Sequence, residues 1–253
     1  MKKIIIQFTC VMFIMFFLFK YNYQVKTNLI IIFNFFINNI IPSMFPIIFI
    51  TNYIKYNINN RKIIRFISLM CSYAPSNAII SINNNEILYS TVINPLFSYV
   101  ILKQYFSISN TLLIIIINLI INYTLLYRHI EKYNNYNENT YNISLIIKDT
   151  MMSIINILGV IIFFNIVITL LNIFISKYVL ILFEITNGFN IISTLNIIKI
   201  RNILLIFLNS FCGIAIFFQI KSINNDASYL LIIKKFIISI IVTIVTIIII
   251  NIF

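Results

Sequence analysis

The sequence is short of charge. Charged residues make up only 9% of its 253 positions, whereas an ordinary globular chain carries about 25%. Hydrophobic residues account for 61%, and the mean hydropathy is +1.01. So little polar surface cannot face water on all sides, which excludes a water-soluble globular domain.

Residues that build metal sites and active sites are also scarce. The sequence has 3 Cys, 1 His and no Trp. Cys10, Cys71 and Cys212 lie far apart and form no Cys-x-x-Cys spacing, so we expect no metal site. We find no nucleophile paired with a base, no paired carboxylates and no Gly-rich phosphate loop. We therefore expect neither enzymatic activity nor a cofactor.

Long apolar runs recur along the whole chain, and each is near the roughly 20 residues that a helix needs to cross a bilayer. We predict an all-α polytopic membrane protein with about seven transmembrane helices. Pro42 and Pro46 interrupt the second run, for which we expect one bent crossing. The runs are Ile4 to Phe19, Thr27 to Tyr53, Ile87 to Phe106, Thr111 to Tyr127, Met151 to Ile175, Asn202 to Ile220 and Leu231 to Phe253.

Two further apolar segments are too short to cross and are broken. Ile63 to Ala74 ends at Pro75, and Val179 to Ile185 continues into Thr186-Asn187-Gly188. Both fit re-entrant hairpins that enter the membrane, break and return. Because the two halves share this order of parts around one linking crossing, we predict an inverted repeat, a common plan of transporters.

These parts divide the chain into five predicted units. They are an N-terminal anchor helix and loop (1–26), a first repeat (27–108), a linking helix and polar loop (109–149), a second repeat (150–222) and a C-terminal transmembrane helix (223–253).

The formal net charge of +12 indicates orientation in a membrane rather than a nucleic-acid partner, because the charges lie between apolar runs. Lys2 and Lys3 precede the first run as in a signal peptide, but no small-residue cleavage site follows, so we expect an uncleaved crossing. A cytoplasmic N-terminus puts 12 of the 18 basic residues on the cytoplasmic side. They are Lys2, Lys3, Lys55, Arg61, Lys62, Arg65, Arg128, Lys132, Lys148, Lys221, Lys234 and Lys235.

The two breaks are the candidate binding site. A broken helix exposes N–H and C=O groups that cost several kcal/mol each in lipid unless they find partners. Glu184 is the one carboxylate placed within the membrane, either as a site residue or as a cap that ties the hairpin together. The other candidates either bind a polar ligand or satisfy the backbone and join helices. They are Pro75, Ser76, Asn77, Asn94, Thr186, Asn187, Gly188, Asn209 and Gln219.

Several motifs together resemble a known family. In the second half these are Glu184-Ile185-Thr186-Asn187-Gly188, Asn209-Ser210-Phe211-Cys212-Gly213 and Gln219. In the first half they are Ile41-Pro42-Ser43-Met44-Phe45-Pro46, Pro75-Ser76-Asn77-Ala78 and Asn94-Pro95-Leu96-Phe97. In this order they are similar to YlbJ-type sporulation integral membrane proteins, of the nucleoside-recognition or Gate group.

The resemblance implies a role in spore formation and a gate- or transporter-like architecture in the cell membrane of a spore-forming bacterium. It names no solute. The expected partners are the lipid bilayer, a small polar solute or ion, and either sporulation membrane proteins or further copies of the chain. Three interpretations stay open: a transporter or gated channel, a non-transporting assembly or signalling component of the spore envelope, and a membrane subunit of a respiratory complex.

Overall fold

The computed structural model describes residues 12, 15–57, 93–126, 142–172, 174–223 and 228–252. All regular secondary structure in these ranges is helical. Five helical stretches are long and apolar enough to cross a membrane: Asn22–Tyr53, Ile108–Leu125, Ile143–Leu171, Ile198–Lys221 and Leu230–Ile250. The described part of the chain is thus an all-α bundle compatible with a polytopic membrane protein. The predicted total of seven crossings stays a prediction.

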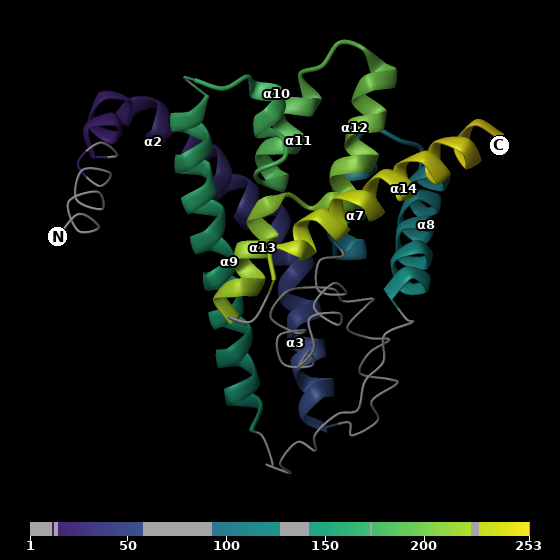
Figure 1. The fold of residues 1–253 in the computed structure, drawn as a ribbon. Coiled ribbons are helices and arrows are strands. Elements are labelled where there is room, and N and C mark those ends of the chain that lie inside the picture. Colours follow the sequence, from purple (N-terminus) through teal and green to yellow (C-terminus); the bar gives the residue numbers. More distant parts are fainter. Residues whose placement is uncertain are drawn as a thin grey trace.

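The first long stretch is continuous but changes direction. It consists of helix α2 (Asn22–Phe35), a π-helical turn η1 (Phe36–Ile40) and helix α3 (Ile41–Asn57), and Figure 1 shows α2 running obliquely before α3 continues downwards. The wide turn lies directly before Pro42, which has no N–H to donate. One helical stretch with a change of direction agrees with the predicted bent crossing, although α2 runs through the predicted boundary at residue 26 without a break.

The predicted crossing over Ile87 to Phe106 differs from the structure. Its described part holds only the eight-residue helix α7 (Pro95–Leu102), which is too short to span a bilayer. Asn94 has a non-helical backbone and caps the helix, because its Oδ1 accepts a hydrogen bond from Leu96 N (2.8 Å). The Asn94-Pro95 pair therefore starts a helix. The next helix, α8 (Ile108–Leu126), matches the predicted linking crossing.

The second half begins with a long straight helix and a reversal. Helix α9 (Ile143–Leu171) covers most of the predicted crossing Met151 to Ile175. It is followed by the one-turn helix α10 (Lys177–Leu180), a turn, and helix α11 (Ile185–Ser193). Both ends of this α10–α11 segment are exposed while its middle is buried, so the reversal lies inside the protein.

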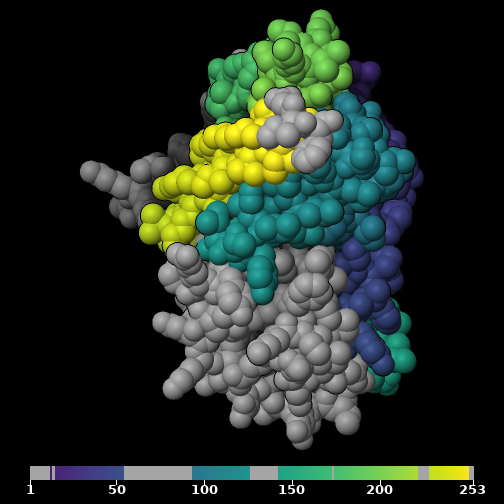
Figure 2. Space-filling model, turned by 90° about the vertical axis from the view of Figure 1, so that its right-hand side faces the viewer, coloured from purple at the N-terminus to yellow at the C-terminus, as the bar shows by residue number. Residues whose placement is uncertain are grey.

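The predicted crossing from Asn202 to Ile220 consists of two helices rather than one. Helix α12 (Ile198–Phe211) ends at Cys212, and helix α13 (Ile214–Ile223) follows after Gly213. This stretch is the most enclosed of the five, with 72% of its apolar window buried against 28 to 39% for the others. Helix α14 (Leu230–Ile252) closes the described chain and packs across α12 and α8 (Figure 2).

One lysine of α14 is buried against α8. The exposed fraction of Lys235 is only 2%, and its Nζ donates a hydrogen bond to Asn122 Oδ1 (3.0 Å). Its neighbour Lys234 is exposed. Lys235 was counted only among the basic residues of the cytoplasmic side, and the structure adds an acceptor for it inside the bundle, supplied by α8. Ser239, Thr243 and Thr246 continue a buried polar stripe along α14, spaced for one helix face.

We predict that Asn122→Leu destabilises the protein by about 1–3 kcal/mol, because it leaves the buried ammonium group of Lys235 without this acceptor. In a Lys235→Met background the same change should cost clearly less, since no charge then needs a partner. Thermal unfolding of the four proteins in detergent micelles measures the difference. Lys234→Met is the control, with an expected effect within about 0.5 kcal/mol. Equal costs in the two backgrounds would show that the pair contributes nothing.

Candidate functional site

The reversal between α10 and α11 is built around Glu184. Its backbone is extended, and its side chain caps α11: Oε1 accepts from Thr186 N (3.0 Å), and Oε2 accepts from Asn187 N (2.9 Å) and from the Thr186 hydroxyl. These backbone N–H groups have no partner within the helix. Glu184 is 1% exposed, so a carboxylate is fixed inside the apolar body at a helix start.

The second break lies at Cys212 and Gly213. Both residues have positive φ, 68° at Cys212 and 79° at Gly213. This left-handed backbone ends α12, because the chain can no longer follow the right-handed helix. Glycine adopts it without cost, whereas a side chain rarely does. Cys212 thus ends α12, and Gly213 continues the left-handed backbone before α13 begins.

The two breaks interlock through backbone hydrogen bonds. At the start of α13, Ile214 N donates to Leu182 O (2.9 Å) and Ala215 N donates to Phe183 O (2.8 Å). The approach is close, since a Cβ on Gly213 would lie 3.2 Å from Glu184 Cα and from Phe183 O. The turn before α11 therefore caps α13 with its carbonyl groups. The N–H groups that the break at Cys212 and Gly213 exposes are therefore paired with the carbonyl groups that the turn before α11 exposes.

A third helix start joins them. Ile93 lies directly before Asn94, the cap of α7. Ile93 and Phe97 at the start of α7 line the same cavity as Glu184 and Cys212. The N-terminal ends of α7, α11 and α13 therefore converge on one place, where a side chain or backbone carbonyl groups already accept hydrogen bonds from each end.

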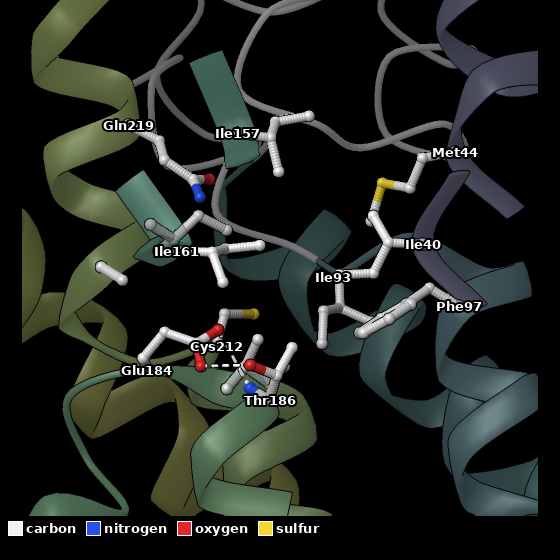
Figure 3. Close-up of a pocket in the computed structure, with 13 residues that line it drawn as sticks. Ile40, Met44, Ile93, Phe97, Ile157, Ile161, Glu184, Thr186, Cys212 and Gln219 are labelled. Carbon is white, nitrogen blue, oxygen red and sulfur yellow. Dashed lines mark hydrogen bonds between the residues drawn. The ribbon is translucent and has the colours of Figure 1, made fainter. Parts of the chain in front are cut away.

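A small enclosed cavity lies at this convergence (Figure 3). Its volume is about 40 Å³, which is room for a few waters or one monatomic ion. Its polar groups come from Glu184, Thr186 and Gln219, and Figure 3 shows the Gln219 amide across the cavity from the Glu184 carboxylate. The remaining wall is mainly aliphatic and aromatic: Ile40, Met44, Ile93, Phe97, Ile157, Ile161, Ile185, Cys212, Ala215 and Ile216.

The structure brings some of the predicted site residues together and separates others. Glu184, Thr186 and Gln219 meet at the cavity. Asn187 faces away from it, and Gly188 lies against α12, where a Cβ would meet Leu208 Cδ2 at 2.5 Å. Asn209 is 1% exposed and does not line the cavity.

The remaining predicted site residues lie elsewhere. Asn94 caps α7 next to the cavity, and Pro75, Ser76 and Asn77 fall outside the described residues, as does the first predicted hairpin. The inverted repeat therefore stays a prediction.

A second hollow, which the sequence analysis did not predict, lies on the side of α11 away from the cavity. It has a volume of about 330 Å³ and is more open than the cavity. Seven of its ten lining residues are polar: Asn28, Thr169, Asn172, Lys177, Asn187, Asn190 and Thr194. Asn187, Asn190 and Thr194 are spaced for one face of α11, a signal that the sequence did contain. We call this space the α11 hollow.

Within the ranges that the structure describes, no three His, Cys, Asp or Glu side chains gather in a way that could hold a metal ion. Comparison with protein-family models, with curated proteins and with solved structures gave no match to this chain. The similarity to the sporulation membrane proteins therefore rests on the sequence motifs alone.

The three glycines give a graded test of the interlocked breaks. Gly213→Ala should destabilise the protein by about 1–3 kcal/mol, because the new Cβ meets backbone atoms and φ is positive. Gly188→Ala should also destabilise it, since the Cβ would lie 2.8 Å from Ile181 O. Gly159→Ala is the control: nothing lies within 4 Å of its Cβ, and alanine favours the helix by about 0.5–1 kcal/mol. Thermal unfolding of each variant measures the series, and equal stabilities at the three positions would contradict it.

Proposed function

We propose that this chain is a multi-pass membrane protein with a gate- or transporter-like architecture, which binds and moves a small polar solute or ion between its helix breaks. The observation that carries the proposal is the enclosed cavity at three helix starts, with a buried carboxylate in its wall. A charged group inside an apolar body is costly and is by default a functional candidate. Broken helices whose ends face a central site are the usual way for transporters to bind polar substrates.

In this conformation the size of the cavity limits which solutes can fit. A volume of about 40 Å³ holds a monatomic ion or a few waters, whereas organic ligands need about 300 Å³ or more. The Glu184 carboxylate and the amide of Gln219 offer oxygen ligands to a cation. A nucleoside, which the motif resemblance brings to mind, would need the cavity to open.

A non-transporting role is the second candidate, and one observation favours it. Three hydrogen bonds tie the Glu184 carboxylate to the first turn of its own helix. A carboxylate held in this way stabilises the break without any solute. In that case the chain is an assembly component of the spore envelope that uses a transporter-like fold. The sporulation context of both candidates, the bacterial cell membrane and the cytoplasmic N-terminus are parts of the proposal.

Ion flux into liposomes that contain the purified chain tests the first candidate. We expect flux of at least one of the cations Na⁺, K⁺ and H⁺, with Cl⁻ as the comparison ion, and Glu184→Gln should lower the cation flux by about tenfold or more, because a charged ligand is lost. Gln keeps one acceptor oxygen for the cap, so the variant should still fold. Asp149→Asn is the matched control. Asp149 lies in the second turn of α9 and does not line the cavity, so this variant should leave flux unchanged.

Two results would reject the transporter candidate. One is the absence of cation flux with folded protein. The other is equal flux in the wild type and the folded Glu184→Gln variant. Either result, together with proteins that co-purify stably with the chain from sporulating cells, would favour the assembly role.

A further inference from the structure

We infer that the α11 hollow is a binding site for a small anionic solute that carries a carboxylate or phosphate group. This inference goes beyond the proposed function, because it assigns a second site with its own ligand class, and it rests on that proposal only for its link to transport. The volume of about 330 Å³ lies at the lower end of the range for small-molecule sites, and it is about eight times that of the cavity beyond α11.

The charge of the lining indicates the sign of the ligand. Lys177, at the start of α10, is the charged residue among the lining side chains. The described carboxylates lie elsewhere, Glu184 in the wall of the cavity and Asp149 about 20 residues before the hollow in α9. The Lys177 ammonium lies 5.5 Å from the centroid of the Tyr178 ring. A lysine beside a hollow that no described carboxylate lines attracts an anion.

A buried donor gives the second reason. The Nδ2 atom of Asn187 is buried and has no hydrogen-bond partner within the described part of the chain. Leaving such a donor unpaired costs about 1–3 kcal/mol, and a turn of the Asn187 side chain, which lines the hollow, would bring the donor to an acceptor oxygen of a ligand there. Asn190 and Thr194 extend the polar face of α11 towards the mouth of the hollow.

The opposite wall is fixed in place. Asn28 Nδ2 of α2 donates to Thr169 Oγ1 of α9 (3.0 Å), and Thr169 Oγ1 in turn donates to Asn165 O (2.8 Å). These hydrogen bonds use one N–H of the Asn28 amide and join α2 to α9. The hollow is therefore built between a rigid α2–α9 wall and the polar face of α11, and only the first turn of α11 separates it from the cavity at Glu184.

Protection of an introduced thiol tests the site. We would label Thr194→Cys with a maleimide in a Cys10→Ser, Cys71→Ser background, which leaves the buried Cys212 in place. The protein is held in phosphatidylcholine nanodiscs, and the probes are inorganic phosphate and succinate. We expect both probes to slow labelling of Thr194→Cys and to leave labelling at Asn196→Cys, which is exposed but outside the hollow, unchanged.

Side-chain variants should weaken this protection. Lys177→Gln should raise the half-protecting anion concentration by about threefold or more, as expected for an exposed charge, and adding Asn187→Ala should raise it further. Lys199→Gln is the matched control, because Lys199 is an exposed lysine at the start of α12 that does not line the hollow; it should change nothing.

Nanodiscs of two different lipids distinguish a lipid headgroup from a free solute as the source of the anion. Slower labelling in phosphatidylglycerol nanodiscs without soluble anion, abolished by Lys177→Gln, would identify a lipid headgroup as the ligand. Slowing by soluble anions in phosphatidylcholine identifies a free solute. Labelling that is indifferent to phosphate, succinate and phosphatidylglycerol would overturn the inference. The assay needs no flux, so protection without flux would reject only the proposed transport, and flux without protection would reject only this site.

Discussion

The whole arrangement depends on one requirement: backbone groups that a helix break exposes inside an apolar body must find partners. The turn at residues 181–184 and the break at Cys212-Gly213 meet this requirement together. Ile214 and Ala215 donate to the carbonyl groups of the turn, and the Glu184 carboxylate accepts from the first turn of α11. Because each unpaired group would cost several kcal/mol in lipid, neither break is stable in this form without its partner.

This contact explains where the polar groups lie. Glycine at 213 allows the backbones to approach closely, so that the starts of α11 and α13 point to the same place as the start of α7. The cavity forms where three helix ends meet and side chains cannot fill the space completely. Helix α11 then has two different neighbours, the enclosed cavity at its first turn and the open hollow along its polar face. Glu184, Thr186 and Asn187 lie between the two spaces at the start of α11.

Local sequence was sufficient for the elements that depend on composition. The apolar runs around α8, α9 and α14 are long enough to predict helices from length alone. The bounds of α8 and α14 are confirmed to within a few residues, whereas α9 begins at Ile143 rather than at Met151. The break at Glu184 was also predictable, since a carboxylate before Thr-Asn-Gly in an apolar stretch indicates a cap. The start of α7 was not predicted because the apolar run from Ile87 to Phe106 has the length of one crossing, whereas Asn94-Pro95 within it is a cap with proline in the first turn.

The parts that were missed depend on tertiary contacts. A single Gly213 in an apolar run is tolerated within membrane helices, and only the nearby carbonyl groups of residues 182 and 183 make it a break. The burial of Lys235 could not be predicted because its acceptor, Asn122, is 113 residues away, although its spacing from Ser239 and Thr243 marked one helix face. The wide use of Asn in this sequence hid the α11 hollow, since Asn28, Asn172 and Asn190 do not stand out individually.

The most direct test of this account is an experimental structure of the chain in lipid nanodiscs at a resolution that shows backbone carbonyl groups. It should show the 181–184 turn within the hydrocarbon layer, with Ile214 N and Ala215 N on the carbonyl oxygens of Leu182 and Phe183. A continuous helix through Cys212 and Gly213, with the 181–184 turn at the membrane surface, would contradict the interlocked breaks and with them both proposed sites.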